Sequence, residues 1–265
     1  MDLSIIIVNF NVKNLLRGCL GSLERERRKT KKLEIEVLVV DNASTDDSSK
    51  MVKKSFPQVK LTKNKTNLGF AKAVNQGIKR AKGEFILLLN PDIVVKENAL
   101  KQIVSFAESR QSVGVVGGRL LNPDGSGQPS VFHLSTFGGA IKEFWLGKKG
   151  TFQKYLPKVN KPQAVEAVSG AAMLIPKTII KKIGLFDEHY FMYFEDLDYC
   201  RRVKEAGLKV FYCPQTEFIH YHGQSGKKIP EKVSHYLVES SKIYHGKLKH
   251  YLINLIIKLG QKWQK

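Results

Sequence analysis

The chain has few cysteines, few acidic residues and no long apolar run. Its 265 residues include only three cysteines, Cys19, Cys200 and Cys213. A small, odd and scattered set argues against a disulfide scaffold and fits a reducing compartment. No segment approaches the roughly 18 apolar residues of a membrane-spanning helix, and the first residues lack the basic and apolar regions of a signal peptide. We therefore expect a cytoplasmic protein.

Three common binding motifs are also missing. The turn after the first predicted strand, residues 9–12, contains no glycine, so the dinucleotide-binding fingerprint is absent. No Gly-x4-Gly-Lys-Ser/Thr segment occurs, which disfavours a P-loop nucleotidase. The cysteines and histidines do not have the paired spacing of a zinc site.

Basic residues, by contrast, are abundant. There are 44 Lys and Arg against 24 Asp and Glu, a formal charge of +20. Because 42% of residues are hydrophobic and 26% charged, the chain is expected to fold into a globular protein. Such an excess suits nucleic acid, an anionic membrane surface or phosphate-bearing substrates. Composition alone does not choose among them.

The first half of the chain alternates between strand-like and helix-like segments. β-Branched runs predict strands, and apolar residues at helical spacing predict helices. The predicted strands are 4–9, 34–41, 59–62, 84–90 and 113–117, and the predicted helices lie near 15–23, 46–55, 70–81 and 100–107. Ser44 or Thr45 is expected to cap the second helix, and residues 25–32 form a solvated connection. This alternation predicts an α/β fold, a mainly parallel sheet with helices on both faces.

The second half is less regular. Residues 119–167 are rich in Gly, Pro, Ser and aromatic residues, and a long irregular stretch of this kind is usually functional or mobile. Regular patterns return with a strand over 168–175, a helix over 195–206 and a strand over 209–212. From residue 231 the chain is predicted to be helical and basic.

Polar residues follow two of the predicted strands. Asp41, Asn90 and Asp92 fall at the carboxyl ends of strands, where open parallel sheets bind ligands. Asp41 could accept hydrogen bonds from a nucleobase or ribose, and Asp92 could hold Mg²⁺ or Mn²⁺. Taken alone, each motif fits an ordinary turn equally well.

An acidic cluster begins the predicted helix at residue 195. Glu195 and Asp196 follow an aromatic run, residues 190–194, and apolar surroundings would raise a carboxyl pKa and make a better base. Asp198 is expected to pair with Arg201 or Arg202, three and four residues further along the helix.

Five motifs in order now resemble a known family. They are Ile7–Phe10, Val40–Asp46, Asn67–Asn75, Leu89–Asp92 and Glu195–Asp196. Together they resemble the inverting glycosyltransferases of family 2, which have a GT-A fold, and in particular the rhamnosyltransferase-like branch. The resemblance covers roughly residues 3–225.

The resemblance implies a nucleotide-sugar site formed by Asn9, Asp41, Asn67, Gly69, Asn90 and Asp92. Asp41 resembles the acid that contacts a uracil or thymine and its ribose. Asn90-Pro91-Asp92 resembles the Asp-x-Asp element of the family. Because Asn replaces the first acid, ligation of Mn²⁺ or Mg²⁺ would fall mainly on Asp92.

The same resemblance implies a catalytic and an acceptor side. Asp196, in the Glu195–Asp196 pair, resembles the base that deprotonates an acceptor hydroxyl, which then attacks the anomeric carbon and inverts it. Gly170 and Ala171 resemble the segment that lines the acceptor. Residues 219–225 resemble the late His-x-x-Gly-x-Ser element of the family, which begins with His220. His220 then resembles a contact to the metal or the diphosphate; the alternative is a histidine on a surface loop.

We expect a GT-A catalytic domain over 1–228, with a nucleotide-sugar half (1–118) and an acceptor half (119–228), and a helical segment over 229–265. In this segment one helical face carries Tyr251, Leu252, Leu255, Ile256, Leu259 and Trp263. Residues 242–265 contain six lysines and no acid. This pattern indicates an anchor on an anionic membrane surface, or a helix that packs on the catalytic domain or on a second subunit.

The leading hypothesis is a glycosyltransferase of cell-surface polysaccharide synthesis, on the cytoplasmic face of the membrane. dTDP-rhamnose is the first choice of donor and UDP-sugars the second, with a glycan or lipid-linked acceptor. One alternative is a basic nucleic-acid-binding protein, although no nucleic-acid motif is present. Another is a nucleotidyltransferase, which would need a glycine-rich basic loop that residues 11–14 do not supply. The oligomeric state is open.

Overall fold

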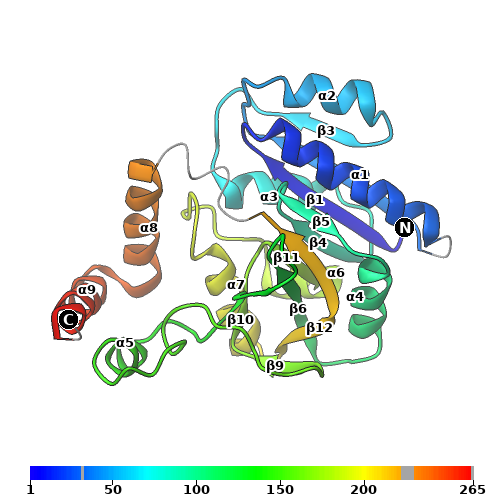
Figure 1. Cartoon of the computed structure of the whole chain (residues 1–265). Helices are drawn as coiled ribbons and strands as arrows, with labels where there is room; N and C mark the ends of the chain where they lie inside the picture. The colour runs from blue at the N-terminus through cyan, green and yellow to red at the C-terminus, as the bar shows by residue number, and fades with distance from the viewer. Residues whose placement is uncertain (31–32, 222–229, 264–265) are drawn as a thin grey trace.

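The computed structural model describes residues 1–30, 33–221 and 230–263, and its centre is a ten-stranded sheet between helices (Figure 1). The strands are β1 (Leu3–Asn9), β2 (Ile35–Asp41), β3 (Lys60–Lys63), β4 (Phe85–Leu89), β5 (Ile93–Val95), β6 (Val113–Leu121), β7 (Gly127–Gln128), β8 (Val131–Phe132), β9 (Gln163–Val165), β10 (Ala167–Val168), β11 (Ala172–Pro176) and β12 (Lys209–His220). The helices are α1 (Lys13–Lys29), α2 (Ser48–Ser55), α3 (Phe70–Arg80), α4 (Ala99–Glu108), α5 (Phe137–Phe144), α6 (Lys177–Ile183), α7 (Glu195–Glu205), α8 (Pro230–His245) and α9 (Lys247–Trp263).

Eight strands of the sheet have the order β3-β2-β1-β4-β11-β6-β12-β5. The other two strands pair at its margin, β7 with β6 and β9 with β12. β1 pairs in parallel with β2 and β4, and β12 pairs in parallel with β6, so the predicted mainly parallel sheet is confirmed. β11 runs antiparallel to both of its neighbours. Its buried apolar sequence is that of any central strand, and only the path of the chain sets its direction. The carboxyl ends of β1, β2, β4 and β12 therefore meet at one edge.

Helices cover both faces of the sheet, as expected. In β1, Leu3, Ile5 and Ile7 belong to the core under α1, α2 and α4, whereas Ile6 belongs to the core under α3, α6 and α7. All four side chains are at most 1% exposed. β1 is thus a central strand that is buried on both faces.

Two predictions in the first half were wrong in detail. The basic residues from Arg25 belong to α1, which continues to Lys29 because buried Glu26 keeps this turn against the protein. Helix α2 begins at Ser48 after Asp47, whose φ is 60° and whose side chain makes no capping bond. Asp46 Oδ1 accepts from the N–H of Ser48 at 3.1 Å. Ser44 instead accepts a hydrogen bond from the backbone N–H of Asn11 at 3.0 Å.

The second half contains more regular structure than its sequence predicts. Residues 119–167 hold the end of β6, three further strands and helix α5, whose Thr136 side chain accepts from the N–H of Gly139. Two glycines in α5 weaken its helical signal. The strand predicted over 209–212 continues to His220, across a register shift between Cys213 and Glu217. The strand predicted over 168–175 is interrupted by residues 169–171.

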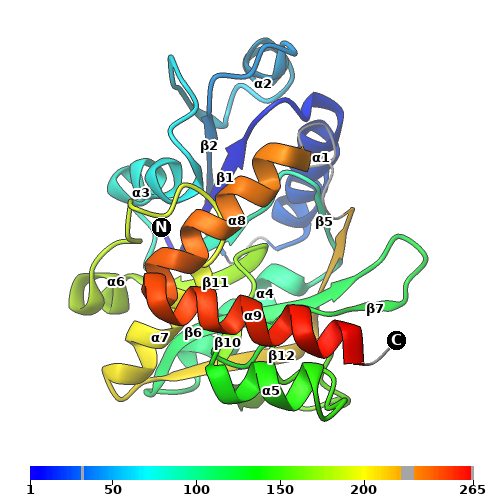
Figure 2. The same ribbon diagram turned by 90° about the vertical axis from the view of Figure 1, so that its left-hand side faces the viewer.

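The C-terminal helices lie along one side of the molecule (Figure 2). Helix α8 packs on the aromatic run before α7: the ring of Tyr236 stacks on Phe191 at 4.3 Å, and Ser240 Oγ donates to the carbonyl of Met192 at 2.8 Å. Helix α9 packs on α5, where a Cβ on Gly260 would lie 2.5 Å from the Phe144 carbonyl oxygen. Within the described residues, none of the helices is long and apolar enough to cross a membrane.

Candidate active site

The first part of the site lies where β1 and β2 end. Asn9 and Asp41 are neighbours in the register of these strands, and both are fully buried. Asn9 Nδ2 donates to Asp41 Oδ1 at 2.9 Å, and Ser49 Oγ donates to Asp41 Oδ2 at 2.6 Å. Asn9 Oδ1 is buried and has no hydrogen-bond partner among the described residues. The structure therefore brings together two predicted nucleotide contacts and leaves one acceptor unsatisfied.

Asn42 joins this strand end to the turn before α3. Its Nδ2 donates to Asn67 Oδ1 at 2.7 Å and to the Gly69 carbonyl at 3.1 Å. Its Oδ1 accepts from Asn64 Nδ2 and from the N–H of Leu68, both at 3.0 Å. The amide thus makes both hydrogen bonds that it can donate and both that it can accept. Asn42 therefore fixes the predicted nucleotide-binding turn to the end of β2. The Val40–Asp46 motif contains Asn42, but spacing alone did not single it out.

Gly69 connects the turn to the other half of the molecule. Its φ of 84° lies in the left-handed region, and a Cβ there would be 2.6 Å from the Phe191 carbonyl oxygen. The next residue, Phe70, donates its backbone N–H to that same carbonyl at 2.6 Å. Only glycine fits this approach. The predicted nucleotide-binding turn is thereby tied to the aromatic run that precedes Glu195.

Asp92 and His220 face each other at the ends of β4 and β12. Gln128 donates from Nε2 to Asn122 Oδ1 and to the His220 carbonyl, so its Oε1 accepts from His220 Nδ1 at 2.7 Å. In the neutral ring, Nε2 then carries a lone pair. Nε2 lies 3.2 Å from Asp92 Oδ1, and both side chains are buried. His220 is 4% exposed on β12, so the surface-loop alternative was wrong.

This pair fits a divalent metal ion. Asp92 Oδ1 is buried without a hydrogen-bond partner among the described residues, and two facing lone pairs repel unless a cation or a proton lies between them. Carboxylate oxygen and imidazole nitrogen both suit Mn²⁺. No cluster of three or more His, Cys, Asp or Glu ligands occurs in the part of the chain that the structure describes. A metal here would need further ligands from the diphosphate. His222 and Ser225, in the motif that begins with His220, lie outside the described residues.

The second part of the site surrounds Asp196 at the start of α7. Its Oδ2 accepts from the N–H of Gly170 at 3.0 Å, and its Oδ1 accepts from the N–H of Leu197 at 2.9 Å. The side chain of Asp196 is partly exposed. Ala171, next to Gly170, accepts from the N–H of Asn90 at 2.9 Å. The segment 170–171 therefore bridges the Asn90–Asp92 turn and the predicted base.

The other two acids in the first turn of this helix are buried. Burial, together with the neighbouring Asp196 carboxylate, raises the pKa of Glu195 well above its ordinary value. Its Oε2 has no hydrogen-bond partner among the described residues. Asp198 pairs with Arg201 at 2.6 Å and Arg202 at 2.9 Å, which confirms the predicted pairing. Asp198 thus stabilises α7, and Asp196 is the carboxylate left partly open to solvent.

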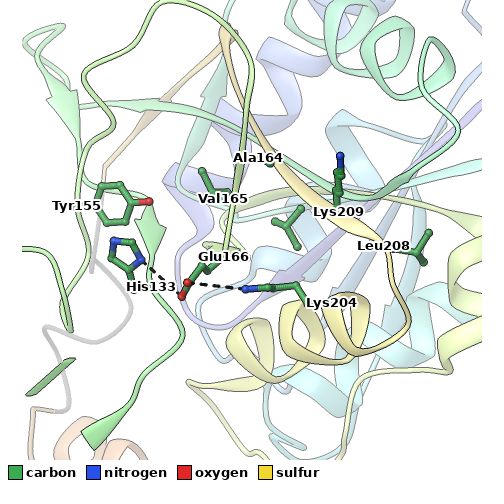
Figure 3. A pocket seen from close by; sticks show the side chains of 9 residues that line it. His133, Tyr155, Ala164, Val165, Glu166, Lys204, Leu208 and Lys209 are labelled. Atoms are coloured by element: carbon green, nitrogen blue, oxygen red, sulfur yellow. Dashed lines mark ion pairs between the residues drawn. The ribbon is translucent and has the colours of Figure 1, made fainter. Parts of the chain in front are cut away.

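A separate cavity of about 330 Å³ lies at the opposite end of β12 (Figure 3). Its lining includes His133, Tyr155, Glu166, Lys204 and Lys209. The His133 and Tyr155 rings stack at 4.9 Å, and Glu166 lies between His133 and Lys204. Because β12 begins at Lys209 and ends at His220, this cavity is not part of the site at the strand ends.

Comparison with known proteins agrees with this geometry. The model of glycosyl transferase family 2 matches residues 4–184. The chain belongs to this family. The matched region contains the ends of β1, β2 and β4 and stops before Asp196 and His220. Membership favours a glycosyltransferase over the nucleic-acid-binding and nucleotidyltransferase alternatives.

Curated relatives of this family 2 member include rhamnosyltransferases. An N-acetylglucosaminyl-diphospho-decaprenol L-rhamnosyltransferase of Mycobacterium tuberculosis is 29% identical over 215 residues, 74% of this chain and 69% of the relative. Rhamnosyltransferase WbbL of Escherichia coli is 28% identical over 174 residues, 64% of this chain and 65% of the relative. The predicted resemblance to the rhamnosyltransferase-like branch is confirmed.

Solved structures share the fold of this glycosyltransferase. A mannosyltransferase of Pyrobaculum calidifontis, crystallised with GDP-Man and Mn²⁺, superposes with a TM-score of 0.63 at 16% identity, over 97% of this chain and 72% of its own. GalNAc-T7 with UDP, GalNAc and Mn²⁺ gives a TM-score of 0.64 at 16% identity, over 83% of this chain and 44% of its own. The predicted GT-A fold is confirmed.

Proposed function

We propose that this chain transfers a sugar, with inversion, from a nucleoside-diphosphate sugar to an acceptor hydroxyl. The observation that carries the proposal is the bridge of Gly170 and Ala171 between two groups. On one side Ala171 binds Asn90, beside Asp92, and on the other Gly170 binds Asp196. A diphosphate-binding side and a carboxylate base are thereby held on opposite ends of one short segment. This is the arrangement that a single displacement requires.

The donor nucleoside lies on Asn9, Asp41 and the turn that contains Asn67 and Gly69. Asn9 offers its unsatisfied Oδ1 to a donor group of the nucleoside. Asp41 keeps its bond to Asn9 and exchanges the Ser49 hydroxyl for a hydroxyl or N–H of the nucleoside. Asn42 keeps the turn in place during this exchange, because its four hydrogen bonds all remain within the protein.

Asp196 acts as the general base. Its two backbone hydrogen bonds fix the carboxylate while each oxygen keeps a further lone pair. The acceptor oxygen loses its proton to Asp196 as it bonds to the anomeric carbon, and the bond from that carbon to the diphosphate oxygen breaks. Glu195 lies behind Asp196 in the protein and, with its raised pKa, adds little negative charge there.

Asp92 and His220 are the residues that would hold Mn²⁺ or Mg²⁺, with Asn90 beside them. A bound divalent ion would stabilise the negative charge of the departing nucleoside diphosphate as a Lewis acid. Gln128 orients the His220 ring through Nδ1, as groups behind metal-bound histidines commonly do.

The first substrates to test come from the relatives. The mycobacterial relative is named for an N-acetylglucosaminyl-diphospho-decaprenol acceptor and a rhamnose donor. We therefore pair dTDP-rhamnose with an N-acetylglucosaminyl-diphospho-lipid, and use UDP-sugars and a glycan acceptor as second choices. Three free, buried cysteines support a reducing cytoplasmic location.

Two variants separate the proposed roles. Asp196→Asn should lower transfer by about 10²-fold or more, the usual contribution of a general base, while binding of the nucleoside-diphosphate sugar is unchanged. Asp92→Asn should instead weaken donor binding in the presence of Mn²⁺. Calorimetric titration of the donor with and without Mn²⁺, together with transfer assays, measures both effects.

Asp124→Asn is the matched control, because Asp124 is exposed in a turn between β6 and β7. It should behave as wild type in both measurements. Normal turnover by Asp196→Asn would exclude that residue as the base. Donor binding by Asp92→Asn with an unaltered response to Mn²⁺ would exclude the proposed metal site.

A further inference from the structure

Helix α9 exposes the apolar face that its sequence predicts. Its inner side, with Ile253 and Gly260, is buried against the protein. Its outer side carries large apolar residues that are 42–76% exposed: Leu248, Tyr251, Leu252, Leu255, Leu259 and Trp263. The helix therefore packs on the catalytic domain and still leaves an apolar stripe open.

Helix α5 extends this stripe from a distant part of the chain. Trp145, just after α5, stacks on Trp263 with 6.3 Å between ring centroids, and its Nε1 donates to the Ile256 carbonyl at 3.0 Å. The apolar residues exposed on and after α5 are Phe137, Ile141, Trp145 and Leu146. α5 and α9 lie side by side in Figure 2. We call the exposed residues of the two helices the α5–α9 face.

Positive charge accompanies the α5–α9 face. Its exposed lysines are Lys142, Lys148, Lys149, Lys247, Lys249, Lys258 and Lys262. Lys258 and Lys262 each follow a leucine of the stripe by three residues, which places them on its flank. The acid of α5, Glu143, is buried and accepts from the N–H groups of Phe152 and Gln153. No acidic residue follows Glu239 in the sequence.

We propose that the α5–α9 face docks on an anionic lipid bilayer. Exposed leucines flanked by lysines, with tryptophan at the edge, match the apolar interior and anionic surface of such a bilayer. A second copy would bring two sets of lysines together with no acid to pair them. Nucleic acid would attract the lysines but would give the leucines nothing apolar to contact.

Docking here places the bilayer beside the acceptor side of the site. α9 follows α8, and α8 holds the aromatic run before Asp196 through Ser240 and Tyr236. A lipid-linked acceptor would thus be presented near the base. Only this last step depends on the proposed function, because vesicle binding needs neither donor nor acceptor.

The two tryptophans of the chain, Trp145 and Trp263, both belong to the face, so selectively excited tryptophan fluorescence reports on it alone. Vesicles of phosphatidylcholine mixed with phosphatidylglycerol should bind the full chain and shift its emission to shorter wavelength. Vesicles of phosphatidylcholine alone should bind far less. The double variant Leu255→Gln, Leu259→Gln should lose at least about 10-fold in affinity, since each leucine side chain buries apolar surface in the bilayer.

Two double variants with the same change in net charge test whether vesicles bind at the α5–α9 face. Lys258→Glu with Lys262→Glu should weaken binding by about 10-fold or more, as expected for about 1 kcal/mol per basic residue. Lys53→Glu with Lys54→Glu changes the net charge equally on α2, at the far side of the molecule, and should have little effect. Equal losses from the two pairs, or equal binding to both kinds of vesicle, would overturn the proposal. So would a dimer in solution that the Leu255, Leu259 variant converts to monomer.

Discussion

At the scale of single residues, Glu195 and Asp196 show how one position along a helix changes the chemistry of a carboxyl group. Asp196 is partly exposed and bonded to two backbone N–H groups. Glu195 is 7% exposed, and one of its oxygens has no hydrogen-bond partner in the part of the chain that the structure describes. Burial and the adjacent Asp196 raise the pKa of Glu195. A buried acid of this kind is ionised more readily in the unfolded chain, so it destabilises the fold as pH rises.

Glu195→Gln is therefore expected to stabilise the protein at neutral pH by about 1–3 kcal/mol, the usual cost of a poorly satisfied buried group. The gain should vanish below pH 4.5, the ordinary pKa of the side chain, because Glu195 is then protonated in both states. It should grow as pH rises from there through the raised pKa of the folded state. Urea denaturation across this pH range tests it. Glu108→Gln, at an exposed position that ends α4, is the control. A gain that does not depend on pH would contradict the pKa argument.

At the scale of elements, the junction before α3 holds the two halves of the site together. Gly69 is the N-cap of α3, and its backbone approaches Phe191 too closely for a side chain. Gly125, in an exposed turn, has the same φ of 84°, but apart from its chain neighbours no atom of the described residues lies within 4 Å of an added Cβ. The two glycines thus share a positive φ and differ in their surroundings.

Gly125→Ala should lower the free energy of unfolding by about 1–2 kcal/mol, because alanine is strained only by the positive φ. Gly69→Ala should lower the free energy of unfolding by about 1–3 kcal/mol more than Gly125→Ala, because its Cβ also overlaps the Phe191 backbone. Chemical denaturation of the two variants measures the difference. Equal losses of unfolding free energy in the two variants would show that the turn and the aromatic run are not rigidly tied.

At the scale of the whole molecule, the C-terminal segment over 229–265 is joined to the catalytic domain in two different ways. α8 packs on the aromatic run and on α7, with the Tyr244 ring 5.3 Å from Phe194 and under the Arg201 guanidinium at 4.6 Å. α9 packs on α5 and exposes its outer side. The boundary predicted at 228 therefore falls before a helix that packs on the aromatic run next to the candidate active site.

Two truncations test this division. A chain that ends at His245 should keep its melting temperature within about 4 °C, because α8 still covers the aromatic run. A chain that ends at residue 229 should melt about 10 °C lower, since it exposes Phe191 and Phe194 and loses several aromatic contacts. Differential scanning calorimetry gives both values. Equal melting temperatures for the two truncated chains would show that α8 adds nothing to the domain.

Much of the site was predictable because it follows local rules. Asp41, Asn90 and Asp92 were located by the ends of apolar strands, and Asp198 by its spacing from two arginines. Asn42 and Ser49 were missed, since their partners lie on other elements and no local pattern marks a buried amide or hydroxyl. His220 could not be separated from a loop histidine, because the bulge before residue 217 hid the continuation of β12.

The sequence by itself determined the alternation of strands and helices, the strand-end acids, the salt-bridged α7 and the basic apolar face of α9. Each depends on the period of a helix or strand, or on neighbours within one turn. Only the tertiary structure decided the direction of β11, the meeting of Asp92 with His220, and the addition of α5 to the face of α9. These depend on contacts between segments far apart in the chain, which are set by how the whole core packs.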